Sequence, residues 1–127
     1  MNLLLDTHVV LWLADDYDKL SEKAKQALTN EDNVRYVSIV SAWEVAIKLG
    51  SGKLRLDGGL SEYLYEVDRN NFYELGATRR YLSFLPELDA IHKDPFDRLL
   101  IATALAENFT IVTADENIRK YKVNSLW

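Results

Sequence analysis

Residues 93–115 read KDPFDRLLIATALAENFTIVTAD, and this stretch contains a complete helix-to-strand unit. Asp94 is a good N-cap, and Pro95 suits the first helical position, where its missing N–H costs nothing. The apolar residues that follow cover nearly all sides of a helix over 95–107, which indicates that this helix is buried. A short apolar strand over 109–112 comes next. Buried helices that alternate with buried strands are typical of parallel α/β sheets.

The same alternation runs through the rest of the chain. It predicts strands over 2–6, 34–39 and 72–75, helices over 7–14, 21–29, 41–49, 60–67, 78–84 and 115–121, and an edge strand over 123–127. We therefore expect an α/β fold in which helices cover both faces of a mainly parallel sheet. The 127 residues contain no repeat, low-complexity tract or linker, so residues 1–127 are expected to form a single domain.

The amino-acid composition limits which metal ligands and binding partners the chain can have. The chain has no cysteine, which excludes disulfides and thiolate metal sites, so a metal would need oxygen ligands with at most His8 and His92 adding nitrogen. A net charge of −5 argues against broad, non-specific coating of nucleic acid. No apolar run approaches the roughly 20 residues of a membrane span, and no signal segment opens the chain. We therefore expect an intracellular, cytoplasmic protein with no membrane partner.

Carboxylates recur where the predicted strands give way to helices. One strand runs directly into Asp6, the next leads to Glu44, and a late one leads through Thr113 to Asp115, while Asp97 lies in the first turn of helix 95–107. The carboxyl ends of parallel strands share one edge of the sheet, so these acids are expected to meet in one cleft. Clustered carboxylates repel one another unless a cation neutralises them. The pattern therefore predicts a Mg²⁺ or Mn²⁺ site and phosphate chemistry.

Each acid also has a purely structural interpretation. Residues 41–44 form an S-x-x-E capping box, Asp94 and Asp115 suit N-caps, and an acid in a first turn suits the helix dipole. A non-catalytic interaction module whose acids serve as caps therefore stays open, as does another acidic-pocket phosphohydrolase. The shared sheet edge favours the metal site, with hydroxyls at Thr7 and Thr113 able to orient a ligating carboxylate.

Basic and histidine side chains are weaker candidates. Solvated surface charge is the simpler interpretation of a basic rim, for which the candidates are Lys48, Lys53, Arg55 and Arg98. His8 suits either a structural role or a contact with phosphate, and His92 is interpreted as a loop residue. The chain offers no Ser-His-Asp or Cys-His arrangement and no glycine-rich phosphate loop, so a side-chain nucleophile is not expected.

Four segments together resemble the motifs of the PIN-domain family, and more closely its VapC-type toxins from microbial toxin–antitoxin pairs. The segments are LLDTH at 4–8, SAWEVAIK at 41–48, HKDPFDRLLIA at 92–102 and VTAD at 112–115. They occur in the family's order and span most of the chain. The resemblance implies a three-layer α/β/α fold around a parallel sheet.

The resemblance also implies a Mg²⁺- or Mn²⁺-dependent endoribonuclease that hydrolyses RNA phosphodiester bonds. The family's acidic quartet falls on Asp6, Glu44, Asp97 and Asp115. Asp94 is a nearby cap that could assist, and Thr113 matches the hydroxyl of the last motif. Family membership further implies a homodimer and a small antitoxin partner that covers the acidic cleft.

Overall fold

A five-stranded sheet forms the centre of the computed structural model, which describes residues 1–127. All neighbouring strands pair in parallel, in the order β3-β2-β1-β4-β5. The strands are β1 (Asn2–Leu5), β2 (Val34–Ser38), β3 (Tyr73–Leu75), β4 (Thr110–Val112) and β5 (Ser125–Leu126). The predicted parallel sheet is confirmed, and β1 is its central strand.

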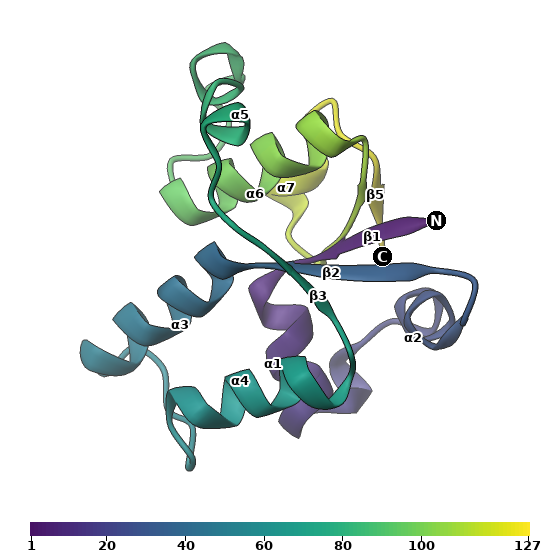
Figure 1. Ribbon diagram of the computed structural model, residues 1–127, viewed down its shortest axis with the longest axis vertical. Helices are drawn as coiled ribbons and strands as arrows, with labels where there is room; N and C mark the ends of the chain where they lie inside the picture. Colours follow the sequence, from purple (N-terminus) through teal and green to yellow (C-terminus); the bar gives the residue numbers. More distant parts are fainter.

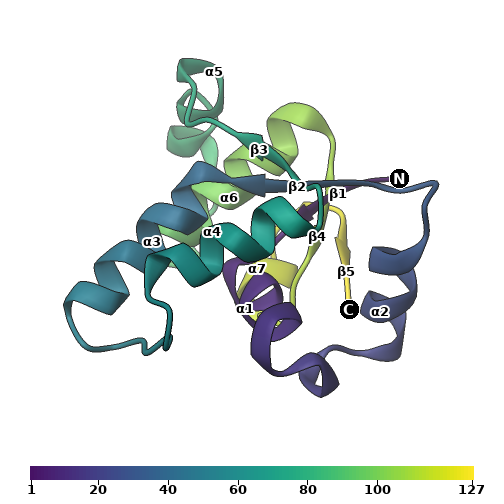
Figure 2. The same cartoon turned by 60° about the horizontal axis from the view of Figure 1, so that its bottom comes forward.

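Helices cover both faces of this sheet, which confirms the three-layer arrangement. Figure 1 shows α1 (Thr7–Asp15), α2 (Glu22–Thr29) and α4 (Leu60–Arg69) below the sheet, and α5 (Arg79–Leu82), α6 (Pro95–Glu107) and α7 (Glu116–Arg119) above it. α3 (Ile39–Gly50) continues directly from the end of β2 and lies beside α4 (Figure 2). None of the helices is both long enough and apolar enough to span a membrane.

The alternation of side chains along β1 explains why both faces are covered. Leu3 and Leu5 point into the core between the sheet and helices α1 and α2, whereas Leu4 points into the core between the sheet and α6. All three residues are fully buried. Successive residues of a strand face opposite sides of the sheet, so an uninterrupted apolar strand needs a helical layer on each side. β1 is therefore a central strand because its sequence has no polar face.

Helices α3, α5 and α7 differ most from the sequence prediction, and α7 covers only Glu116–Arg119 of the expected 115–121. α3 begins at Ile39 rather than at residue 41, because the Ser38 hydroxyl caps the helix by accepting from the backbone N–H of Val40 at 3.1 Å. The predicted helix over 78–84 is shorter: α5 ends at Leu82, and a separate 3₁₀ turn follows over Leu85–Glu87. The earlier start of α3 moves Glu44 out of the first turn, so the predicted capping box is wrong.

Candidate metal centre

The carboxyl ends of β1 and β4 bring the first and last motifs together. β1 and β4 are paired neighbours, and the backbone N–H of Asp6 donates to Val112 O at 3.1 Å. The Thr113 hydroxyl donates to Asp6 Oδ2 at 2.7 Å, and both side chains are buried. Asp6 occupies the N-cap position of α1 but makes no capping hydrogen bond with its side chain. Thr113 is therefore the side chain that orients the Asp6 carboxylate.

Glu44 lies on α3 and faces the start of α1. The Thr7 hydroxyl donates to Glu44 Oε1 at 2.6 Å, and Lys48 Nζ donates to Glu44 Oε2 at 2.6 Å. The Glu44 residue is only 3% exposed, so this carboxylate is buried with a cation and a hydroxyl as its partners. Thr7 and Lys48 thus both contact Glu44, although the sequence did not indicate which acid the Thr7 hydroxyl would meet.

A histidine and two carboxylates form the tightest group at this edge. His92 Nε2 lies 2.8 Å from Asp97 Oδ2 and 3.4 Å from Asp115 Oδ2. The potential ligand atoms of these three residues all lie within 4.8 Å of one another. His92 Nε2 is buried and, although it lies close to both carboxylates, makes no hydrogen bond to either of them. Its nitrogen is therefore available to a ligand placed between the two acids.

The acids of this edge influence one another electrostatically. Burial, together with the negative charges of Asp6, Asp94 and Glu44, raises the pKa of Asp97 from 3.8 to about 7, although His92 opposes the shift. Burial also raises the pKa of Asp6, against the hydrogen bond from Thr113. The structure thus brings Asp6 and Glu44 close enough to affect Asp97, while the group of three potential ligands contains only His92, Asp97 and Asp115.

Lys48 carries the positive charge nearest to these acids. Burial alone would lower its pKa, but the hydrogen bond to Glu44 and the charges of Glu44, Asp94 and Asp97 outweigh burial and raise the pKa. Lys48 therefore stays protonated and offsets part of the negative charge at this edge of the sheet.

The donor set suits a hard divalent cation. Carboxylate oxygens are the ligands that Mg²⁺ and Mn²⁺ prefer, and an imidazole nitrogen is compatible with Mn²⁺ as one member of such a set. His92 Nε2 is buried without a hydrogen-bond partner and lies between two carboxylates, one of which has a raised pKa. A cation bound among these groups would reduce the repulsion between the carboxylates. The residues of this edge therefore fit a divalent metal.

The acids at the N-termini of α6 and α7 show both interpretations, helix capping and metal binding. Asp94 Oδ1 accepts from the backbone N–H groups of Phe96 and Asp97, at 2.8 and 3.2 Å, so the predicted cap is confirmed. The two carboxylate oxygens of Asp115 have different partners. Oδ1 accepts from the backbone N–H of Asn117 at 2.8 Å and so caps α7, whereas Oδ2 faces His92. Capping and metal binding are therefore not exclusive at Asp115.

Arg98 lies outside this constellation. Its guanidinium donates to the backbone carbonyls of Leu85, Asp89 and His92 and to the Tyr121 hydroxyl. Arg98 thus holds in place the loop that precedes α6, and the same loop carries His92. The structure gives it a supporting role for His92 and no contact with the acids.

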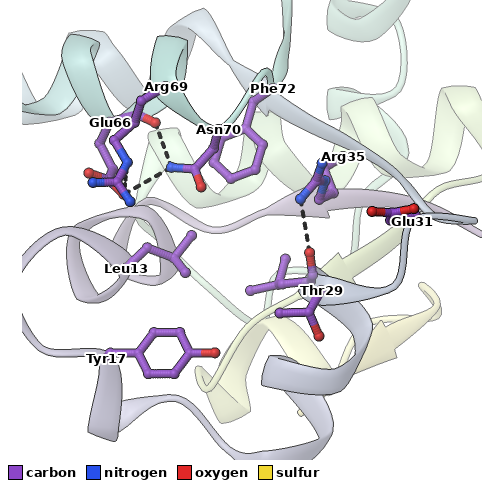
Figure 3. Close-up of a pocket in the computed structure, with 10 residues that line it drawn as sticks. Leu13, Tyr17, Thr29, Glu31, Arg35, Glu66, Arg69, Asn70 and Phe72 are labelled. Atoms are coloured by element: carbon purple, nitrogen blue, oxygen red, sulfur yellow. Dashed lines mark hydrogen bonds and ion pairs between the residues drawn. The ribbon is translucent and has the colours of Figure 1, made fainter.

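Two cavities are candidates for the binding site. One of about 260 Å³ at the carboxyl edge is lined by Asp6, His8, Trp12, Ala114 and Asp115. A larger one of about 350 Å³ lies near the amino ends of β2 and β3, where Figure 3 shows Glu66 with Asn70 and Arg69.

Three of the charged side chains that line the larger cavity, Arg35, Glu66 and Arg69, already have partners within the protein. Glu66 Oε1 accepts from Asn70 at 2.9 Å, and Arg35 donates to Leu28 O at 2.9 Å. The smaller cavity contains two of the predicted acids and is therefore the better candidate for chemistry, despite its size.

The sequence pattern indicates the acids, whereas it predicts His92 only as a loop residue. His92 does lie in a loop, and its side chain enters the group of potential ligands only because that loop folds back on the start of α6. The one local signal is its position five residues before Asp97, within the HKDPFD segment. A five-residue separation across a helix start does not by itself predict a contact.

The chain is similar to proteins of a known family. A family model described as PIN domain matches residues 3–124. Ribonuclease VapC22 of Mycobacterium tuberculosis is 27% identical to the chain over 121 residues, which cover 94% of this chain and 92% of that protein.

Solved structures share the fold. VapBC2 from Rickettsia felis, bound to a DNA fragment from their promoter, matches with a TM-score of 0.69 and 16% identity, covering 98% of this chain and 97% of that chain. FitAcB from Neisseria gonorrhoeae matches with a TM-score of 0.65 and 18% identity, covering 97% and 95%. VapBC-5, a member of the VapBC family of toxin–antitoxin systems from Mycobacterium tuberculosis, matches with a TM-score of 0.62 and 12% identity. The match covers 98% of this chain and 94% of that chain.

Proposed function

Because the chain belongs to the PIN-domain family, we propose that it is a Mg²⁺- or Mn²⁺-dependent endoribonuclease that acts as the toxin of a toxin–antitoxin pair. The observation that carries this proposal is the convergence of Asp97, Asp115 and His92 at one edge of the sheet, with Asp6 and Glu44 beside them. The ribonuclease name of the relative from Mycobacterium tuberculosis supports the reaction. Action on cellular RNA would place the protein in the cytoplasm.

The acids and His92 are the residues that would hold the cation. Asp97 and Asp115 would provide carboxylate oxygens, His92 would provide a nitrogen, and Asp6 would complete the set from the end of β1. A bound divalent cation would supply positive charge for the scissile phosphate. It would also lower the pKa of a nearby water molecule, so that this water can lose a proton near neutral pH. Thr113 keeps the Asp6 carboxylate in a fixed orientation, and Thr7 does the same for Glu44.

Water is the expected nucleophile, since the hydroxyls of the site are already engaged. Thr7 and Thr113 are 5% and 0% exposed, and each donates its proton to a carboxylate. Because both side chains are buried, neither hydroxyl oxygen is exposed to attack a phosphate. In hydrolysis the water oxygen forms a bond to phosphorus as the P–O bond to the leaving nucleotide breaks. Lys48 is placed to balance the negative charge that the phosphate brings to this edge.

RNA cleavage tests this function. The purified protein is expected to cleave single-stranded RNA with Mg²⁺ or Mn²⁺ and to lose that activity in EDTA. Asp97→Asn keeps the size of the side chain but removes a charged ligand, so it should lower the cleavage rate at least about a hundredfold. Asp89→Asn, which removes a carboxylate from the exposed loop before α6, is the matched control. Full metal-dependent activity in folded Asp97→Asn would contradict the assignment.

A small antitoxin protein is the second partner in this proposal. Several of the solved structures that share the fold are toxin–antitoxin complexes, which supports a partner of that kind. Co-purification with the product of the neighbouring reading frame, together with loss of RNA cleavage in the complex, is the expected result. A neighbouring product that neither binds nor inhibits would contradict this part of the proposal.

A homodimer is also proposed, and α3 offers the surface for it. Ile39, Trp43 and Ile47 follow one another at every fourth position and are 40%, 58% and 45% exposed. Residues four apart lie on the same face of a helix, so the three form one apolar stripe. Exposed large apolar side chains that adjoin one another are typical of protein interfaces. We name Ile39, Trp43 and Ile47 the α3 stripe.

A further inference from the structure

A row of basic side chains lies beside the acidic edge, in the segment that links α3 to α4. Next to the cavity that contains Asp6 is a second one of about 280 Å³, whose lining includes His8, Lys48 and Lys53. A third, of about 220 Å³, includes His8 and Arg55. His8 lines all three cavities. The acidic site and the basic side chains therefore border the same exposed histidine.

The link between α3 and α4 folds so that its cations face outward. The backbone N–H groups of Lys53 and Leu54 both donate to Lys48 O, at 2.9 and 3.1 Å, so the link turns back against the end of α3. Leu54 and Leu56 pack against the core, whereas the alternate residues Lys53 and Arg55 are exposed. Alternating apolar and basic residues thus anchor the segment and present two cations to solvent.

The two cations have no partners within the protein. Neither Lys53 nor Arg55 takes part in an ion pair or a side-chain hydrogen bond, while the nearby Asp16 pairs with Lys19 at 3.3 Å. Both side chains are exposed, and each lines a cavity that shares His8 with the acidic cavity. Such cations are available to an anionic ligand.

Resting on the ribonuclease function proposed above, we propose that Lys53 and Arg55 bind two successive phosphates of the RNA strand, beside the bond that is cleaved. Lys53 and Arg55 line two cavities that both share His8 with the acidic cavity, so a strand that leaves the acidic site along this side passes both cations. The strand would leave the acidic site past His8 and reach these cations next. We name Lys53 and Arg55 the basic track. It contributes affinity, and the acids perform the cleavage.

Binding of a fluorescent single-stranded RNA tests the track without cleavage. All variants carry Asp97→Asn, and affinity is measured by fluorescence anisotropy at several salt concentrations. Lys53→Ala/Arg55→Ala is expected to weaken binding about tenfold, and to reduce the slope of log affinity against log salt by about 1.4, since each lost phosphate contact on a single strand contributes about 0.7. Lys23→Ala/Lys122→Ala removes the same charge elsewhere and should keep the slope.

The outcomes separate this inference from the function on which it rests. An unchanged affinity and slope in the folded track variant would overturn the track, even if the wild type cleaves RNA. A wild type without metal-dependent cleavage would overturn the function, whereas the binding measurement would still decide the track. If the double variant fails to fold, the single variants Lys53→Ala and Arg55→Ala are measured instead, each with an expected fall in slope of about 0.7.

Discussion

Asp97 is the residue whose ionisation bears most directly on the site. Its pKa rises from 3.8 to about 7 because the carboxyl is buried and surrounded by other acids. A carboxyl with a raised pKa in the folded state favours folding when it is protonated, so its contribution to stability is present at low pH and is lost as pH rises from about 4 to about 7. The metal-free protein is therefore destabilised by this charge at neutral pH.

Asp97→Asn should relieve this penalty. In EDTA, the variant is expected to be more stable than the wild type by the order of 1 kcal/mol above about pH 7, and the difference should shrink toward pH 4. Urea unfolding at a series of pH values measures it. A difference that is constant across this range, or that grows toward low pH, would contradict the raised pKa.

Thr113 acts through Asp6, and its hydroxyl can be removed with little change in shape. Thr113→Val loses the 2.7 Å hydrogen bond to Asp6 Oδ2, which leaves the carboxylate free to turn. Affinity for Mn²⁺ should fall about tenfold to a hundredfold, as expected when a group that orients a ligand is lost. Calorimetric titration with Mn²⁺ is the measurement.

Thr103→Val is the control for this variant. Thr103 is equally buried, but its hydroxyl donates to the backbone oxygen of Leu99 within α6. The control should lose some stability and keep its Mn²⁺ affinity. Equal losses of Mn²⁺ affinity in both variants would assign the effect at Thr113 to general destabilisation.

At the scale of elements, α6 shows how one cap positions a ligand. Asp94 Oδ1 accepts from the N–H groups of the first turn and so fixes the backbone that carries Asp97. Asp94→Ala should cost about 1 kcal/mol in unfolding free energy, whereas Asp94→Asn should cost almost nothing because asparagine caps equally well. Urea unfolding in EDTA distinguishes them. A loss in Asp94→Asn as large as in Asp94→Ala would show that the carboxylate charge matters more than the cap.

Elements with strong local signals were predictable from the sequence. Asp94, Pro95 and the apolar residues that follow predict α6 with the bounds that the structure has. The sequence predicts the start of α3 two residues too late, because Ser41 and Glu44 resemble a capping box while Ser38 is the residue that caps the helix. Two serines three residues apart offer the same local chemistry, and tertiary packing decides between them.

The contacts between elements were less predictable. The meeting of Asp6 with Thr113 agrees with the rule that parallel strands share a carboxyl edge, although the sequence does not indicate this particular pair. The contact of His92 with Asp97 and Asp115 depends on the path of a loop that Arg98 holds through backbone carbonyls. No periodicity in the sequence encodes such a path, so the histidine of the site was not identified.

At the scale of the whole molecule, the parallel sheet places acids from four segments at one edge and leaves the α3 stripe beside them. Trp43 contacts the ring of Phe96, one residue before Asp97, with ring centroids 5.0 Å apart. A second copy packed on the stripe would therefore lie next to the site. A single domain over residues 1–127 stays a prediction, in keeping with two helical layers on one sheet.

The dimer can be tested by one charge on this stripe. Trp43→Glu places a carboxylate in the proposed interface, which should shift the protein from dimer to monomer because an unpaired buried charge costs several kcal/mol. Light scattering after size-exclusion chromatography gives the mass. Tyr65→Glu is the control, since Tyr65 is 65% exposed on α4, outside the stripe. A wild type that is monomeric at high concentration would contradict the dimer.

Calorimetric titration of the wild type and of Asp6→Asn/Asp97→Asn with Mn²⁺ tests most directly whether these side chains share a cation. The wild type is expected to bind Mn²⁺ and to gain thermal stability from it, whereas the double variant should be folded and show at least about a tenfold loss of affinity. A folded wild type that takes up no Mn²⁺, or a double variant that binds it equally well, would contradict the metal centre.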